Sequence, residues 1–380
     1  MRLSHTAPQW KGGNVGIRRQ SKSAAQHGDS SRRRFGVKLL GAAAFVSVLL
    51  ATAVLTGLPD SRGDVRGGTY GFVSVDALMN SSDAEINAEM DAMVAMGASW
   101  VRVGLHWNRI EAVPGVFDWG VTDRIVAAAK RHNLNVLGLL GGGAPLWAAT
   151  PTPVSFMEAP PQDPRQFAAF ALAAATHYVS SVATWEIWNE PNNPIFFPPA
   201  PNVAAYAAML RAAYAAIHSV SGNVTVLSGG LAPEPAGKVI PPTQFVSQLY
   251  AAGAGGSFDG LSLHPYTFPF PIDSDPNGGW SSIAEAHQVM IDHGDGGKKI
   301  WLTEFGAPTG TSPVSVSEQA QANILVDAIH RAESMSYVGP LFVYTIRDTG
   351  VDPSNPEDNF GVLRHDFTRK AAYQALAGTR

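Results

Sequence analysis

The feature that most restricts the fold of this 380-residue chain is a regular alternation of two kinds of segment. Short runs of apolar and β-branched residues, typical of buried strands, are separated by longer alanine-rich stretches that are compatible with helices. The expected strands are residues 69–74, 100–107, 135–140, 184–188, 224–228, 259–266, 300–305 and 340–346. The expected helices between them are residues 82–96, 121–132, 164–179, 203–220, 242–252, 281–293 and 317–334.

Strands separated by helices imply parallel pairing through crossover connections. Eight such units in residues 68–380 predict an α/β fold, a (β/α)8 TIM barrel, rather than two doubly wound domains. We treat 68–380 as one domain because no low-complexity break or block of charge interrupts it. The hydrophobic fraction of 45% predicts a large buried core and excludes disorder.

The segment before this domain has a different character. Residues 1–38 carry nine basic side chains and one acidic side chain, and residues 39–58 carry no charge over a length that can cross a bilayer as a helix. The basic flank predicts a cytoplasmic N-terminus. Residues 39–58 are expected to be a transmembrane anchor or a signal peptide cut near Ala51-Thr52-Ala53, and residues 31–35 resemble a twin-arginine export signal. With 59–67 as a linker, the barrel is expected outside the cytoplasm, either secreted or anchored to the membrane.

The charge of the chain also divides between these segments. The net charge of −4 combines a head of +8 with residues 39–380, which carry 18 basic and 30 acidic side chains. A body this acidic repels phosphate backbones, so nucleic acid is excluded as a partner. The chain has no cysteine, which excludes disulfides and thiolate chemistry. We expect a monomeric catalytic domain with no metal and no cofactor.

Two glutamates lie at the ends of expected strands. Pro191 stops the fourth strand directly after Glu190, and Glu304 lies near the end of the seventh strand. Period-two alternation would place Ile300, Leu302 and Glu304 on one face, directed toward the barrel axis. Three βα units separate the glutamates, so we expect their carboxylates to face each other across the barrel mouth.

Opposed carboxylates of this kind suit cleavage of a glycosidic bond. One carboxyl is held protonated and gives its proton to the leaving oxygen, while the other stays ionised and attacks or stabilises the sugar. Each glutamate alone could equally be a salt-bridge or capping residue, but a pair at strand ends favours catalysis. A lyase or aldolase barrel has no support, because no lysine stands at an expected strand end to form a Schiff base.

The residues around both glutamates resemble those of the retaining glycoside hydrolases of clan A, most closely family 39 and the cellulase-like members of family 5. The motifs are Asn189-Glu190-Pro191 within 185–192 and Thr303-Glu304-Phe305-Gly306, and the stretches 107–111, counted here with the second strand, and 114–119 are also similar. The resemblance implies that Glu190 is the acid/base and Glu304 the nucleophile in hydrolysis of an oligo- or polysaccharide. A transglycosylase that acts on an envelope polysaccharide and a non-catalytic carbohydrate-binding barrel are the alternatives.

Further polar side chains are expected at the mouth. Alternation places Arg102 and His106 on one face of the second strand, and His264 and Tyr266 on one face of the sixth. The resemblance implies that Arg102, His264 and Tyr266 support the catalytic carboxylates. It also implies that Asn189 binds the sugar 2-hydroxyl, which requires the chain to leave regular strand geometry at Asn189. A core position for His106 is an equally good interpretation.

Aromatic rings at strand ends are candidates for stacking on the apolar faces of sugars. Trp107, Trp147 and Tyr344 are the best placed of them. The clan usually has a tryptophan at the end of the eighth strand, whereas this chain has Tyr344 there. The floor of the innermost sugar site is therefore expected to differ from that of the clan.

Overall fold

The computed structural model describes residues 69–74, 78, 80–151, 158–233 and 239–378. Eight parallel strands form a closed barrel in chain order, and β1 pairs with β8 to close it. The strands are β1 (Tyr70–Ser74), β2 (Trp100–His106), β3 (Asn135–Gly141), β4 (Thr184–Asn189), β5 (Thr225–Gly230), β6 (Gly260–Leu263), β7 (Lys299–Phe305) and β8 (Val338–Val343). The predicted (β/α)8 barrel is confirmed. The predictions for residues 1–38, 39–58 and 59–67 lie outside the described residues.

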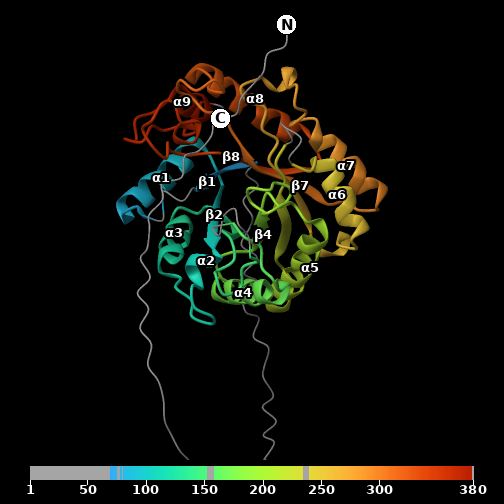
Figure 1. Cartoon of the computed structure of the whole chain (residues 1–380). Helices are drawn as coiled ribbons and strands as arrows, with labels where there is room; N and C mark the ends of the chain where they lie inside the picture. Colours follow the sequence, from blue (N-terminus) through green and yellow to red (C-terminus); the bar gives the residue numbers. More distant parts are fainter. Residues whose placement is uncertain (1–68, 75–77, 79, 152–157, 234–238, 379–380) are drawn as a thin grey trace, which may run out of the picture. The chain divides into compact units, whose positions relative to one another are not determined.

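Helices connect these strands and lie outside them (Figure 1). They are α1 (Asp83–Met96), α2 (Trp107–Ile110), α3 (Gly120–Arg131), α4 (Pro164–His177), α5 (Val203–Val220), α6 (Pro242–Ala251), α7 (Ser282–Asp292), α8 (Glu318–Ser334) and α9 (Ala371–Ala377). The start of α1 is fixed by a capping box in which Ser82 and Glu85 satisfy each other's backbone amides. Its end is fixed by Gly97, which adopts φ 95°, a left-handed conformation open to glycine.

In the described part of the chain, α5 is the only helix long and apolar enough to cross a membrane. Its buried side chains, among them Tyr206, Leu210 and Ile217, pack in the barrel's main apolar core. The helix lies between β4 and β5 in the chain and contacts α4 and α6. These contacts identify α5 as one of the barrel's own connecting helices.

Two predicted boundaries are wrong, and one helix was not predicted. Residues 107–110 form the short helix α2 and do not continue the second strand. Strand β6 ends at Leu263, so His264 and Tyr266 lie in the loop that follows it. Helix α9 was not predicted, because its seven residues are too few for a clear helical period.

Two apolar clusters make up the core. A small one lies inside the barrel, where Trp100, Leu137 and Phe342 from separate strands meet with Val73 and Leu227. The larger cluster includes the outer faces of the strands and the inner faces of the helices. The inner cluster fills the barrel beneath its mouth, so polar side chains higher on the same strands are held over a packed floor.

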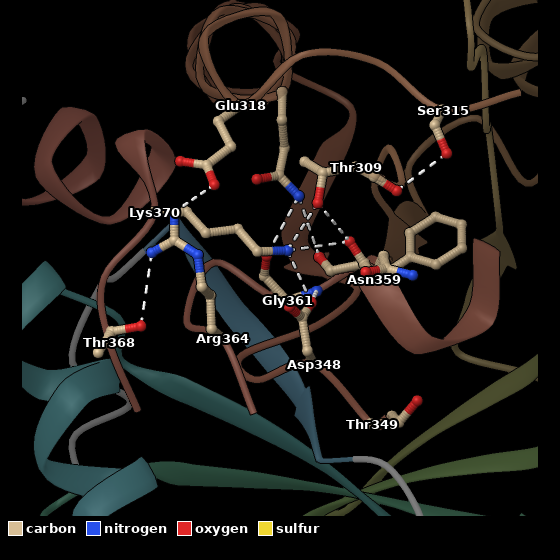
Figure 2. A network of polar contacts seen from close by, with 12 residues as sticks. Thr309, Ser315, Glu318, Asp348, Thr349, Asn359, Gly361, Arg364, Thr368 and Lys370 are labelled. Carbon is tan, nitrogen blue, oxygen red and sulfur yellow. Dashed lines mark hydrogen bonds and ion pairs between the residues drawn. The ribbon is translucent and has the colours of Figure 1, made fainter. Parts of the chain in front are cut away.

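A buried ion pair secures the loop after β8 (Figure 2). Lys370 Nζ lies 2.7 Å from Asp348 Oδ1 and 2.8 Å from Thr309 Oγ1, and the Gly361 amide also donates to Asp348 Oδ1. Burial raises the pKa of Asp348 and lowers the pKa of Lys370, because each group loses water, and their mutual attraction opposes both changes. The pair joins the loop after β7, which carries Thr309, to the loop after β8.

Candidate active site

A cavity of about 470 Å³ opens where the strands end. Its lining includes residues at or just after the C-terminal ends of six strands, namely Ser74, His106, Gly141, Asn189, Glu304 and Tyr344. The C-terminal end of a (β/α)8 barrel is where such folds carry their chemistry. The cavity therefore lies at the end of the barrel where the sequence predicted the site.

The end of β4 departs from regular strand geometry. Trp188 adopts φ 71° and Glu190 adopts φ 41°, on either side of Asn189. Trp188 is buried in the outer core against Phe167, and the Asn189 side chain reaches Arg102 inside the barrel. The expected departure from alternation at Asn189 is confirmed. Asn189 thereby lines the cavity, while Glu190 lies beside His264 and is not among the lining residues. Left-handed geometry at residues other than glycine is costly and is typical of functional sites.

The end of β7 is irregular in a way that alternation did not predict. Leu302 pairs with Leu341 and Phe305 pairs with Val343, so β7 has one residue more than β8 over this interval. Ile300 and Leu302 belong to the outer core, and it is Trp301 that packs on the inner cluster. The expected shared face of Ile300, Leu302 and Glu304 is therefore wrong. The extra residue, a β-bulge, turns Glu304 back into the mouth.

Arg102 occupies the centre of the site, and its side chain is 2% exposed. Its Nε donates to Glu186 Oε2 at 2.6 Å, its Nη1 to Glu304 Oε1 at 2.6 Å, and its Nη2 to Asn189 Oδ1 at 3.0 Å. Burial alone would lower the pKa of Arg102, but the charges of Glu186 and Glu304 raise it, so the guanidinium stays charged. One cation thus fixes the geometry of three side chains.

Glu304 is held as a carboxylate by its neighbours. Besides Arg102, the Tyr266 hydroxyl donates to Glu304 Oε2 at 2.9 Å. Burial raises the pKa of Glu304, but the charge of Arg102 and the hydrogen bonds from Tyr266 and Arg102 lower it, and the pKa lies below its ordinary value. Burial and the charge of Glu304 raise the pKa of Tyr266 far above its ordinary value, so Tyr266 stays a donor.

Glu190 has a different set of partners. Asn193 Nδ2 donates to Glu190 Oε2 at 2.8 Å, and His264 Nδ1 lies 3.1 Å from Glu190 Oε1. The same His264 Nδ1 lies 3.5 Å from Glu304 Oε2, so one fully buried imidazole stands between the two carboxylates. Among the residues that the structure describes, no arginine lies at hydrogen-bond distance from Glu190, whereas Arg102 lies at 2.6 Å from Glu304. The two carboxyl groups are therefore placed in unlike surroundings.

Glu190, His264 and Glu304 each offer an atom able to ligate a metal, and these atoms lie within 4.8 Å of one another. Donors from Arg102, Tyr266 and Asn193 are already directed at the two carboxylates. A cation is thus present in the guanidinium of Arg102 itself, and it pairs with Glu304. We interpret the group as an acid–base cluster.

Comparisons with solved structures agree with this arrangement of the chain. A family 39 glycoside hydrolase from Bacteroides cellulosilyticus WH2 matches 82% of this chain with a TM-score of 0.66 and 23% sequence identity, over 63% of its own length. A monomeric β-xylosidase from Caulobacter crescentus CB15 matches 82% of the chain with a TM-score of 0.64 and 17% identity, over 67% of its own length. The chain has the fold of family 39 glycoside hydrolases.

Other glycoside hydrolases share this barrel. An exo-β-1,4-mannosidase from Opitutaceae bacterium strain TAV5 matches 82% of the chain with a TM-score of 0.56 and 17% identity, over 60% of its own length. No protein-family model matches the chain, and no curated protein matches it by sequence. This chain spans less than two thirds of the Bacteroides and Opitutaceae proteins, which therefore contain regions that it does not match.

Within the glycoside hydrolase fold, two of the expected sugar-stacking residues lie away from the cavity. Trp107 is fully buried, stacks on Phe170 and donates its indole N–H to Glu111 Oε2 at 2.7 Å. Trp147 packs edge-on against Trp107 and donates to the Glu111 carbonyl at 3.0 Å. The prediction for Trp107 is wrong because residues 107–110 turn into α2 and carry its ring into the core. Trp147 packs behind it and is not among the residues that line the cavity.

Two other predicted residues do line the cavity of this barrel. His106 lies at the end of β2 beside Gly142, where an added Cβ would come within 2.4 Å of His106 Nδ1. Tyr344 follows β8, packs edge-on against Tyr266, and donates its hydroxyl to Glu357 Oε2 at 3.3 Å. Tyr344 therefore adjoins Tyr266, the residue that donates to Glu304.

Two buried residues of the site, Glu186 and Thr303, were not among the candidates predicted from the sequence. Both are fully buried, and the Thr303 hydroxyl donates to Glu186 Oε1 at 2.8 Å. Glu186 could have been found from the sequence, because it is a charged residue inside an otherwise apolar strand and demands a buried partner. Thr303 gave no such signal. A threonine is an ordinary strand residue, and the bulge in β7 is invisible to alternation.

Proposed function

We propose that this chain is a retaining glycoside hydrolase that cleaves an oligo- or polysaccharide by double displacement. The observation that carries the proposal is the spacing of the carboxylates, since an oxygen of Glu190 and an oxygen of Glu304 lie within 4.8 Å of each other. Retaining enzymes hold their two carboxyl groups about 5 to 5.5 Å apart, whereas inverting enzymes leave about 6.5 to 9.5 Å for a water molecule. The spacing here supports direct attack by a carboxylate.

The unlike surroundings of the two glutamates support their roles. Glu304, paired with Arg102 and bonded by Tyr266, is proposed to attack the anomeric carbon as the leaving oxygen departs. Glu190 is proposed to give its proton to that oxygen and then to take a proton from the water that releases the sugar from Glu304. Asn189, held by Arg102 at the lining of the cavity, is proposed to bind the sugar 2-hydroxyl.

The substrate is proposed to be a carbohydrate on the strength of the cavity and the shared fold. The similar structures include a β-xylosidase and an exo-β-1,4-mannosidase, so neutral pyranosides of these classes are the first substrates to test. The basic residues 1–38 and the uncharged residues 39–58 support a further proposal that the barrel acts outside the cytoplasm.

The test uses the full chain and a panel of aryl glycosides and of β-glucan, xylan, mannan and bacterial envelope glycans. Glu304→Ala is expected to lose turnover by at least a thousandfold, and Glu285→Ala, on the exposed face of α7, is the matched control that keeps it. Azide should restore part of the activity of Glu304→Ala and give a glycosyl azide of inverted anomeric configuration. Azide with Glu190→Ala should give the retained configuration, because there it attacks the glycosyl-enzyme.

Three other outcomes would contradict the proposed nucleophile or favour a different function. Full activity of Glu304→Ala on the cleaved substrate contradicts the proposed nucleophile. Binding of a glycan by the parent chain with no turnover of any substrate makes it a carbohydrate-binding barrel. Products longer than the substrate, formed when an acceptor sugar is present, make it a transglycosylase that uses the same residues.

A further inference from the structure

The imidazole of His264 stands between the two carboxylates of the site, and both of its nitrogens are engaged. Nδ1 lies 3.1 Å from Glu190 Oε1 and 3.5 Å from Glu304 Oε2, while Nε2 lies 3.1 Å from Thr303 Oγ1. A neutral imidazole carries its proton on one nitrogen only. The nitrogen that carries it decides whether His264 accepts a hydrogen bond from Glu190 or donates one to it.

The direction of the hydrogen bonds on the Nε2 side follows from the partners of Thr303. Its hydroxyl has one hydrogen, and Glu186 Oε1 lies 2.8 Å away. Glu186 also accepts the Gly230 amide at 3.0 Å and Arg102 Nε at 2.6 Å, so it is a carboxylate with no hydrogen to give. Thr303 must therefore donate to Glu186, and its oxygen is left to accept the N–H of His264 Nε2.

This chain of hydrogen bonds is sealed from solvent. Glu186, His264 and Thr303 are all 0% exposed. Strand β5 covers the contact, since a Cβ built on Gly230 would lie 2.1 Å from His264 Nε2 and 2.7 Å from Thr303 Oγ1. Glycine at this position lets the backbone approach closely, which leaves no room for water to offer Nε2 another partner.

We propose that Thr303 is a positioning residue for the catalytic proton. It holds a proton on His264 Nε2 and thereby presents His264 Nδ1 to Glu190 as the place where the acid/base proton is shared. The inference rests on the proposed function, because it concerns the proton that Glu190 gives to the leaving oxygen. Thr303 makes no hydrogen bond to either carboxylate of the catalytic pair, and it reaches Glu190 through His264.

The proton balance follows from this arrangement. With Nε2 protonated, a neutral His264 accepts at Nδ1 the hydrogen bond of a protonated Glu190. The proton passes from Glu190 to the glycosidic oxygen as the bond from the anomeric carbon to that oxygen breaks and the bond to Glu304 forms. The oxygen of an incoming water later bonds to the anomeric carbon as the bond to Glu304 breaks, and the proton of that water passes to Glu190.

The opposite tautomer would disturb this step. A neutral ring with its proton on Nδ1 would donate to Glu190, which favours the ionised carboxylate and removes the acid. The charged and titratable groups around His264 are Glu190, Glu304 and Tyr266, with Glu186 and Arg102 one hydrogen bond further away. Glu304 also lies near Nδ1, but it is ionised and has no hydrogen to donate. Glu190 is therefore the carboxyl group that can donate to an unprotonated Nδ1, so its protonation depends on the tautomer of His264.

The kinetic test compares Thr303→Val, which removes the hydroxyl at nearly constant shape, with Thr303→Ser, which keeps it. Two aryl glycosides of the same sugar are used, one with a leaving group that departs without a proton and one that needs protonation. Thr303→Val should lose ten- to hundredfold in kcat/KM on the second substrate, less than threefold on the first, and move the alkaline limb of its pH profile. Thr303→Ser should restore the parent values, and Thr176→Val, at an exposed threonine of α4, should match the parent.

Several outcomes would overturn the inference. These are a Thr303→Val profile equal to that of the parent, an equal loss on both leaving groups, or a Thr303→Ser variant as impaired as Thr303→Val. Full activity of Glu304→Ala would instead overturn the proposed function itself.

If Thr303→Val does not fold, nitrogen-15 NMR of the parent chain identifies the tautomer of His264 without any need for turnover. The His264 signals are assigned by their loss in His264→Gln. A proton on Nε2 is expected, and a neutral ring protonated on Nδ1 contradicts the inference.

Discussion

Arg102 and Glu304 form a buried ion pair across the interior of the barrel, with Nη1 2.6 Å from Oε1. The two residues come from β2 and β7, which are not neighbours in the sheet. The pair therefore serves two purposes at once, since it holds the proposed nucleophile ionised and joins distant strands over the inner apolar cluster. Predictions about activity and about stability both follow from it.

Arg102→Met should destabilise the fold strongly. It leaves two buried carboxylates, Glu186 and Glu304, without their cation, and removing one partner of a buried pair costs about 3 to 5 kcal/mol. Arg124→Met is the matched control, because Arg124 pairs with Asp83 on the surface and should cost at most about 1 kcal/mol. Urea unfolding of both variants measures the difference, and equal costs would contradict the account.

Tyr266→Phe should make the proposed nucleophile less acidic. The hydrogen bond from Tyr266 helps to lower the pKa of Glu304 from its ordinary value of 4.5, so its loss raises that pKa. The ionised form of Glu304 is then lost at a higher pH, and the acidic limb of the kcat/KM profile moves upward. A hydrogen bond to a charged group is worth about 1.5 to 3 kcal/mol, which corresponds to a loss of about tenfold to a hundredfold in rate. An unchanged limb would contradict this role.

Lys370→Met should show how much the loop after β8 depends on its buried cation. The variant leaves Asp348 charged and unpaired, at a cost of about 3 to 5 kcal/mol. Adding Asp348→Asn keeps the acceptor for the Gly361 amide and removes the charge, so the double variant should regain part of that loss. A double-mutant cycle by thermal unfolding measures the coupling. A double variant less stable than Lys370→Met would contradict the account.

Trp107→Phe should act on stability and leave sugar binding unchanged. The variant loses the hydrogen bond to Glu111 and part of a packed ring, and a cost of about 1 to 3 kcal/mol is expected. KM should stay within twofold of the parent, because the ring is fully buried. A tenfold rise in KM with unchanged stability would restore the interpretation of Trp107 as a stacking residue.

The barrel was predicted well from the sequence because the alternation of strand and helix patterns is repeated along the chain. Each strand and helix has its own apolar pattern, and an error at one boundary leaves the alternation of the other segments intact. The seven expected helices all form, and helix α5 has the bounds that were predicted for it. The ends of elements were less predictable, since β6 stops at Leu263 and residues 107–110 become helical.

The site was predictable only as far as alternation holds. Arg102 and His106 follow it and both line the cavity. Asn189 and Glu190 break it, and the conflict itself indicated an irregular backbone, which the positive φ angles at Trp188 and Glu190 provide. The bulge in β7 gave no such warning, so the hydrogen bonds of Thr303 could be found only from the structure.

The most direct test of Glu304 as the nucleophile is to measure the mass of a trapped glycosyl-enzyme intermediate. A 2-deoxy-2-fluoro glycoside of the cleaved sugar with a good leaving group should react with the full chain, and its glycosyl-enzyme should accumulate. The fluorine slows both formation and release of this intermediate, whereas the good leaving group speeds only its formation. Peptide mapping is predicted to find one sugar residue on Glu304, and none in Glu304→Ala. Turnover with no adduct, or an adduct on another residue, would contradict the assignment of Glu304 as the nucleophile of a retaining glycosidase.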